Sequence, residues 1–259
     1  MKIGLMQGRL LQPAHNHIQE FPENWQTEFS ILKECGLIGV EWLITKGCAL
    51  NNPMYETPMV AAKYPIISIC VDTLVDERIV DENYLNTHLF TLCETIMDST
   101  LIRNITIPLL EESSMSDDKK RKQFCSLVKP IGEKFPEIKF SFEAELGMKE
   151  LQEIISLCDN FYVTYDTGNI TSYGLDHTEY IKFFANKINN VHLKDRTFDA
   201  KTVEPLKGDT NFKTIFKTLK EIKYDGPHII QTARATTGKE KETILKHKKI
   251  FEDLYEKSI

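Results

Sequence analysis

The sequence lacks an excess of basic residues. Among its 259 residues, 32 lysines and arginines are set against 38 aspartates and glutamates, and the formal net charge is −6. A protein that binds a nucleic-acid backbone usually carries a positively charged face. Short basic runs, such as KKRK at 119–122, are typical of the solvated face of an amphipathic helix. The composition therefore argues against a nucleic-acid partner.

The sequence also lacks paired cysteines and long apolar runs. Its six cysteines are far apart and form no CxxC pair, which argues against a disulfide framework and against a structural zinc site: Cys35, Cys48, Cys70, Cys93, Cys125 and Cys158. The first residues, MKIGLMQGR, hold too short an apolar run for a signal peptide, and no window reaches the length of a membrane span. We therefore expect a cytoplasmic protein with no membrane partner.

What the sequence does contain is a regular alternation of short apolar runs and amphipathic stretches. Eight runs predict strands, at 2–6, 38–43, 66–71, 102–107, 138–142, 161–166, 188–192 and 228–230. Helical patterns fall between them, at 24–35, 83–97, 117–134, 148–158, 177–186, 211–222 and 239–255, with Asn24 as the expected cap of the first. Strict alternation at this length predicts an α/β fold, a (β/α)8 TIM barrel in a single domain over 1–259. The alternative is an open doubly wound sheet, which usually carries a GxGxxG turn that is missing here.

Polar residues end the predicted strands, and in a parallel barrel these ends gather on one face. Glu143, Asp166, His192 and Gln231 end four consecutive strands. Two carboxylates, an imidazole and an amide oxygen suit one divalent metal ion, and this mixture favours Mn2+ while leaving Mg2+, Co2+ and Zn2+ open. The other polar residues at strand ends are Gln7, Arg9, Glu41, Asp72, Asn104 or Thr106, Glu145, Asn169, Lys194 and Arg234.

Each of these residues also has a plain structural interpretation. Asp166 can cap the turn that follows it, and His192, beside Lys194 and Asp195, can belong to a surface ion pair. Four candidate ligands at four neighbouring strand ends are harder to explain in this way, because catalytic groups in barrels come from several strand ends. We therefore interpret the four residues together as a metal site.

The segments MKIGLMQGRL, GVEW, SFEAEL, YDTGN, VHLKDR and IIQTAR occur in this order. Together they resemble the sugar phosphate isomerase/epimerase family, a branch of the xylose isomerase-like TIM barrel superfamily. The resemblance implies one divalent metal held by Glu143, Asp166, His192 and Gln231. It also implies isomerase or epimerase activity, in which proton transfer next to a carbonyl proceeds through an enediolate. Relatives often form homo-oligomers.

The chain departs from the family pattern at two positions. The last ligand is commonly Glu where this chain has Gln231, and the DTG segment often ends in His where this chain has Asn169. In the ketose 3-epimerases two metal-bound glutamates act on opposite faces of the sugar, and an amide cannot accept a proton. Glu143 is then the expected base of a one-base aldose–ketose isomerase, unless Glu145 or Lys194 replaces the missing base of an epimerase.

The expected substrate is a small carbohydrate. Arginine suits bidentate recognition of phosphate or carboxylate, so a phosphorylated or acidic sugar is suggested. Ion pairs along the rim of the barrel are the plain interpretation of the same arginines. The residues expected to contact the substrate are Gln7, Arg9, Glu41, Asn169, Arg196 and Arg234.

Two other functions remain open from the sequence. A sugar-binding barrel that lost its chemistry is compatible with Gln231, because a fold does not establish an activity. An endonuclease IV-like metal phosphoesterase would need more histidines at strand ends and a basic face, and the chain has seven histidines and a net negative charge.

Overall fold

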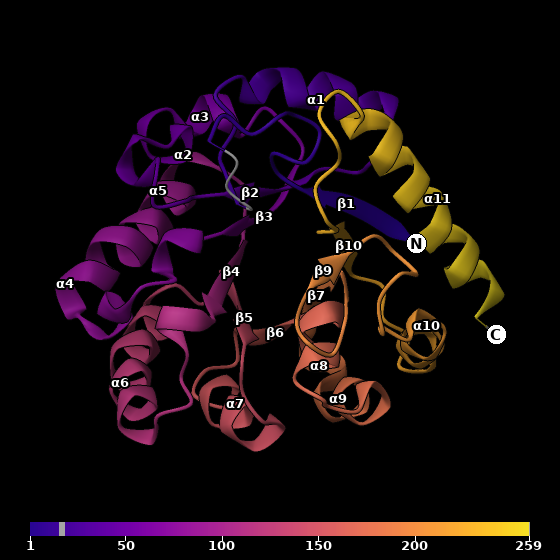
Figure 1. Ribbon diagram of the computed structural model, residues 1–259. Coiled ribbons are helices and arrows are strands. Elements are labelled where there is room, and N and C mark those ends of the chain that lie inside the picture. Colours follow the sequence, from indigo (N-terminus) through magenta and orange to yellow (C-terminus); the bar gives the residue numbers. More distant parts are fainter. Residues whose placement is uncertain (16–18, 259) are drawn as a thin grey trace. The chain divides into compact units, whose positions relative to one another are not determined.

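Eight parallel strands form a closed barrel in the computed structural model, which describes residues 1–15 and 19–258 (Figure 1). The strands follow one another around the barrel in the order β1, β10, β7, β6, β5, β4, β3 and β2. Their bounds are Lys2–Met6 (β1), Val40–Leu43 (β2), Ile66–Cys70 (β3), Asn104–Leu109 (β4), Lys139–Ala144 (β5), Phe161–Asp166 (β6), Ile188–Leu193 (β7) and Pro227–Ile230 (β10). The predicted (β/α)8 fold is confirmed.

Helices follow the strands along the chain. They are α1 (Trp25–Glu34), α2 (Pro53–Glu56), α3 (Pro58–Ala61), α4 (Glu82–Leu85), α5 (Thr91–Ser99), α6 (Asp118–Lys134), α7 (Met148–Ile155), α8 (Thr167–Ser172), α9 (His177–Phe184), α10 (Phe212–Glu221) and α11 (Glu240–Lys257). Single turns of 3-10 helix lie at Ala49–Asn51, Asp72–Leu74, Glu77–Val80, Glu111–Ser113 and Ala185–Lys187.

Close contacts group the chain into two compact units. The first unit combines Met1–Glu41 with Thr164–Ile259, and the second is Trp42–Val163. The expectation of a single domain over 1–259 stays a prediction.

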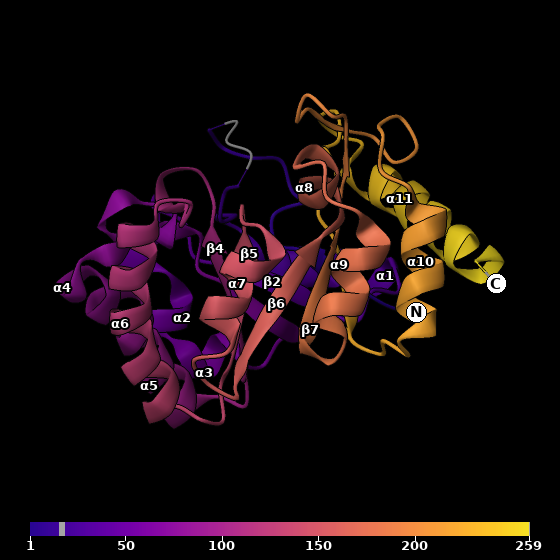
Figure 2. The same cartoon turned by 90° about the horizontal axis from the view of Figure 1, so that it is seen from below.

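The first unit holds the strand pairs β1–β10, β10–β7 and β1–β2, all parallel. Helices α9 and α10 lie side by side next to β7, and α11 packs on α10 (Figures 1 and 2). The ring of Phe212 lies 6.1 Å from Phe216 and 5.1 Å from Phe251, centroid to centroid. The first contact lies within α10 and the second joins α10 to α11, and together they bury the apolar stripes that the sequence pattern predicts.

The second unit contains β3, β4 and β5, and the first half of β6. Phe140 and Phe142 on β5 contact the ring of Phe161 edge to face, with centroid separations of 5.8 and 5.1 Å. Phe140 is paired in register with Phe161, so the two rings meet across neighbouring strands. The pairing of β4 with β5 runs from Asn104–Lys139 to Leu109–Ala144, which brings Glu143 to the carboxyl end of β5.

The structure corrects several of the predicted elements. Strand β4 runs past Pro108 to Leu109, so Asn104 begins the strand and does not end it. The predicted helix 83–97 is split by a π-helical turn at Asn86–Phe90. Asn24 makes no capping hydrogen bond with its side chain. The loop predicted at 198–209 contains a short strand, β9 (Thr202–Val203), which pairs antiparallel with β8 (Asp195–Arg196).

No helix in the described part of the chain is both long enough and apolar enough to cross a membrane.

Candidate metal centre

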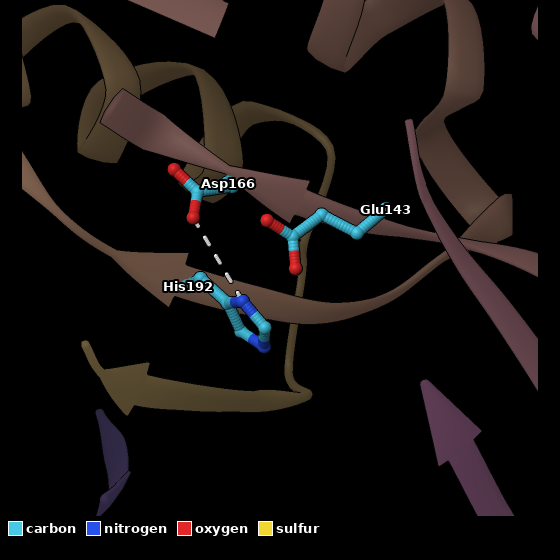
Figure 3. A group of neighbouring side chains, drawn as sticks. All are labelled: Glu143, Asp166 and His192. Carbon is cyan, nitrogen blue, oxygen red and sulfur yellow. Dashed lines mark ion pairs between the residues drawn. The ribbon is translucent and has the colours of Figure 1, made fainter. Parts of the chain in front are cut away.

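Asp166 ends β6, and His192 is the last residue but one of β7. The Oδ2 atom of Asp166 lies 3.9 Å from Nδ1 of His192. One candidate ligand atom from each of Glu143, Asp166 and His192 lies within 4.8 Å of the other two, and all three side chains are buried. Figure 3 shows the three side chains directed toward one another. The structure therefore brings together three of the four residues predicted as ligands.

Asp166 uses its two oxygens for different purposes. Its Oδ1 accepts a hydrogen bond of 2.8 Å from the backbone N–H of Asn169 and so caps α8. Its Oδ2 forms an ion pair of 2.7 Å with Nζ of Lys194. The capping role and the role at the site are thus compatible, because each employs a separate oxygen.

The two residues after Asp166 also contact Lys194. The Thr167 hydroxyl donates to the carbonyl oxygen of Lys194 at 2.6 Å and accepts from its N–H at 2.9 Å. A Cβ added at Gly168 would lie 2.9 Å from Cγ of Lys194, so only glycine lets the lysine stem pass this close. All three residues of the DTG segment therefore help to place Lys194 beside Asp166.

His192 is held from its other side by Glu41. The Nε2 atom of His192 lies 3.2 Å from Oε2 of Glu41, and both side chains are fully buried. Asn190 donates from Nδ2 to the same Glu41 oxygen. Asn190 was not among the predicted site residues, although it precedes His192 by two positions and so lies on the same face of β7.

Gln231 directly follows β10, which is the strand next to β7. Ile229 is the register partner of His192, and the N–H of Gln231 donates to the carbonyl oxygen of Leu193 at 3.1 Å. Side chains two apart share a strand face, which places Gln231 on the side of His192. Its Oε1 is buried and accepts no hydrogen bond from any residue within 1–15 and 19–258. A buried amide oxygen without a donor suits a cation ligand.

The residues of this centre fit a divalent metal ion. Carboxylate oxygens and an imidazole nitrogen converge, and an amide oxygen is available on the neighbouring strand. Carboxylates this close together would repel one another, and one positively charged side chain, Lys194, lies against Asp166. Such a donor set is compatible with several divalent ions and does not identify one.

The predicted arginines Arg9 and Arg234 lie around a buried carboxylate that the sequence analysis missed. Glu28 accepts hydrogen bonds from the backbone N–H of Gly8 and of Leu10, at 2.8 and 3.1 Å. Burial raises the pKa of Glu28 to about 7, although both hydrogen bonds and the two arginines lower it. Arg234 donates from Nη1 to the carbonyl oxygen of Gly8 at 2.8 Å. The signal in the sequence was a glutamate on the apolar face of α1, between Trp25 and Leu32.

The remaining predicted residues lie in varied surroundings. Gln7 and Asn169 are buried, and Arg9 donates from Nη2 to Oε1 of Gln19 at 3.2 Å. Arg196 donates from Nε to the hydroxyl of Thr202 at 3.3 Å. Glu145 accepts from the backbone N–H of Glu111 at 3.2 Å. None of these contacts assigns a role in chemistry.

The model of the xylose isomerase-like TIM barrel matches residues 110–252, which is more than half of the chain and includes Glu143, Asp166, His192 and Gln231. A curated relative, the inosose dehydratase of Clostridium tetani (strain Massachusetts / E88), is 26% identical over 146 residues. That match covers 46% of this chain, which spans about half, 49%, of the relative's length.

Two solved structures share the fold. One is the IOLI protein with a binding zinc atom, at a TM-score of 0.76 and 17% identity, covering 100% of this chain and 99% of that one. The other is a D-tagatose 3-epimerase-like protein, at a TM-score of 0.74 and 17% identity, covering 100% of this chain and 98% of that one. At this level of identity the likeness concerns the fold.

Proposed function

The chain belongs to the xylose isomerase-like TIM barrel family, and from this we propose that it is a divalent-metal-dependent isomerase or epimerase of a small sugar. The observation that carries the proposal is the convergence of Glu143, Asp166 and His192 within 4.8 Å at buried strand ends. Gln231, with its buried Oε1, is proposed as the fourth ligand. Mn2+ is the ion we propose, because a mixture of oxygen and nitrogen ligands suits an ion of intermediate hardness.

Glu143 is the proposed base. A bound divalent ion would polarise the sugar carbonyl and so acidify the neighbouring C–H group. Glu143 would remove this proton at a carboxylate oxygen and return it to the adjacent carbon, because a carboxylate can be tuned to act near neutral pH. Transfer between C1 and C2 on one face of the sugar, together with passage of the hydroxyl proton from O1 to O2, converts a ketose to an aldose, and the reverse transfers convert an aldose to a ketose. This one-base reaction needs no second carboxylate.

An epimerase would need a second group that carries a proton on the opposite face. Gln231 is excluded from this role, because an amide does not accept a proton. Glu145 lies two residues after Glu143, so strand alternation places it on the same face, but its carboxylate accepts a hydrogen bond from the backbone N–H of Glu111. Lys194 is the better candidate of the two, as the group that donates the returning proton, because its ammonium group lies beside Asp166.

A small polyhydroxylated sugar is the proposed substrate. Gln7, Arg9, Asn169, Arg196 and Arg234 are proposed to contact it, as the sequence suggests. Burial raises the pKa of Glu28 to about 7, so near neutral pH this carboxyl balances the positive charge of Arg9 and Arg234 only in part. The remaining positive charge is compatible with a phosphorylated or acidic sugar.

Dehydration is a second candidate reaction, since the curated relative is an inosose dehydratase. Loss of water next to a carbonyl begins with the same proton removal and then expels a hydroxyl group from the adjacent carbon. The same base, Glu143, would serve in both reactions. The two candidates differ only in the fate of the carbanion that follows.

The test is proton exchange in deuterated water with Mn2+ added, over a panel of neutral sugars, acidic sugars, sugar phosphates and inososes. Label at C2 with formation of an aldose supports the isomerase, and label at C3 with inversion supports the epimerase. Loss of water supports the dehydratase. A protein that binds Mn2+ but exchanges no proton would be a non-catalytic sugar-binding barrel. Glu143→Gln is the matched control, because it keeps a ligand oxygen and removes the base.

A further inference from the structure

The two ring nitrogens of His192 face different groups. Nδ1 lies 3.9 Å from Oδ2 of Asp166, and Nε2 lies 3.2 Å from Oε2 of Glu41. The first separation is too long for a hydrogen bond, while the second is within reach of one. Two ligands of the same ion, each roughly 2.1 Å from it, are separated by roughly 3–4 Å. The side of His192 that bears Nδ1 therefore has the spacing of a metal site.

Glu41 lies behind the imidazole, away from Asp166. The last residue of β1, Met6, is its register partner, and its side chain has no exposed surface. Asn190 donates to the same Oε2 atom that contacts His192. The sequence suggested that Glu41 binds substrate, and this stays a prediction. Its surroundings fit a role in which it acts through His192.

We propose that Glu41 and Asn190 are positioning residues that fix the tautomer of His192, with the hydrogen on Nε2 and the lone pair of Nδ1 directed to the metal. A neutral imidazole carries one hydrogen, and an ionised carboxylate only accepts hydrogen bonds. The hydrogen must then lie on Nε2 for the contact with Glu41 to be favourable. Nδ2 of Asn190 also lies 3.3 Å from Nε2 of His192, but its shorter contact is the hydrogen bond that it donates to Glu41. Asn190 holds the Glu41 oxygen in place. A carboxylate behind a metal-bound histidine also raises the basicity of the ligand.

This inference rests on the metal site of the proposed function, but the tautomer can be measured without any metal. Two-dimensional 1H–15N spectra of 15N-labelled, metal-free protein distinguish the two tautomers, and His192→Asn assigns the signals. We expect the Nε2–H tautomer in the wild type. Glu41→Gln keeps the side-chain volume but its amide can also donate to Nε2, so we expect a mixture of tautomers. The dissociation constant for Mn2+, measured by titration calorimetry, should rise by roughly 10–100-fold.

Two further variants distinguish a specific effect on His192 from a non-specific loss of structure. Glu28→Gln removes a different buried carboxylate, and we expect it to leave both the His192 tautomer and the affinity for Mn2+ unchanged. Asn190→Ala should weaken Mn2+ binding less than Glu41→Gln, because the carboxylate remains. If Glu41→Gln does not fold, as judged by circular dichroism, the tautomer of the wild type still tests the proposal, because Nδ1–H there would contradict it.

The outcomes for the two proposals differ. An Nδ1–H tautomer in the wild type, or unchanged Mn2+ affinity in a folded Glu41→Gln variant, would overturn the positioning role and leave the proposed reaction standing. A wild type that binds no divalent ion but holds the Nε2–H tautomer would overturn the proposed function and support the positioning role of Glu41 and Asn190. A wild type that shows proton exchange, Nε2–H and weakened metal binding on loss of Glu41 supports both.

Discussion

The side chain of Thr167 joins two strand ends, because its hydroxyl bonds both backbone groups of Lys194. Thr167 follows β6, Lys194 follows β7, and both are buried. A buried N–H or C=O group left without a partner costs about 1–3 kcal/mol. This one side chain therefore satisfies two groups that the end of β7 leaves available.

Replacing Thr167 by valine should lower the free energy of unfolding by about 2 kcal/mol or more, since valine keeps the shape and loses both hydrogen bonds. Urea unfolding of the metal-free protein measures the loss. Thr167→Ser is the matched control, because it keeps the hydroxyl, and it should lose less than half as much. Equal losses in the two variants would show that the methyl group matters and the hydrogen bonds do not.

The fold was predictable because its signal is local. Buried parallel strands are short apolar runs, and eight of them alternate with amphipathic stretches along this chain. The errors in the predicted elements arose where tertiary contacts determine the end of an element. Pro108 was read as the end of a strand, yet the pairing of β4 with β5 continues through Pro108–Glu143 and Leu109–Ala144. A missing N–H next to the end of a strand removes only one hydrogen bond, so the strand tolerates it.

The site was predictable only in part. The positions of Asp166 and His192 follow from strand ends, which a sequence can indicate. The contact of Glu41 with His192 joins residues 151 positions apart, and no local pattern encodes such a pairing. Asn190 could have been found, because the period of two places it on the face of His192. Glu28 stood out only as a charge on the apolar face of a helix.

Glu28 should make stability depend on pH near neutrality. Burial raises its pKa from 4.5 to about 7, so the folded state binds the proton more tightly than the unfolded state. Its contribution to stability is complete below pH 4.5, falls as the pH rises and is lost above about pH 7. Between pH 5 and pH 8 this amounts to roughly 2–3 kcal/mol.

The variant Glu28→Gln stays neutral over this range, so its stability should lack this decline. Urea unfolding at several values of pH measures the free energy of unfolding of both proteins. As the pH rises, the variant should become increasingly more stable than the wild type. Glu34→Gln, an exposed glutamate at the end of the same helix, serves as the control and should follow the wild type. Parallel curves for wild type and Glu28→Gln would contradict the raised pKa.

His228 should lower the stability of the protein as the pH falls, whereas Glu28 lowers it as the pH rises. Burial lowers its pKa from 6.5 to about 3, and its ring lies 5.2 Å from Tyr224 and 5.9 Å from Tyr255, centroid to centroid. The unfolded state therefore binds the proton first, and stability is lost as the pH falls below 6.5. Between pH 7 and pH 5 the loss from this residue is about 2 kcal/mol.

The variant His228→Phe removes the titrating group and keeps an aromatic ring in the cluster. Its free energy of unfolding should fall less than that of the wild type between pH 7 and pH 5, by about 2 kcal/mol. His15→Gln, at an exposed histidine, is the control and should behave as the wild type. An unchanged acid dependence in His228→Phe would mean that the ring is protonated in the folded state as readily as in the unfolded state.

Gln231 offers a test of the metal centre that does not depend on activity. Its buried Oε1 accepts no hydrogen bond from the described residues, so the metal-free protein makes no use of this oxygen. Gln231→Leu should therefore change the stability of the metal-free protein by no more than about 1 kcal/mol. The dissociation constant for Mn2+ should rise by roughly tenfold or more, which corresponds to about 1.4 kcal/mol of lost ligation. Unchanged affinity would remove Gln231 from the ligand set.

The reverse change, Gln231→Glu, adds the carboxylate that a two-base epimerase requires. Its negative charge should tighten Mn2+ binding, because charge on the ligands increases affinity for a divalent cation. It also supplies a proton acceptor where the wild type has an amide. In deuterated water the variant should label a ketose at C3 with inversion, while the wild type labels C2. Calorimetry measures the affinity, and NMR locates the label. Tighter binding without label at C3 would show that the residue at 231 ligates the metal but does not face the reacting carbon.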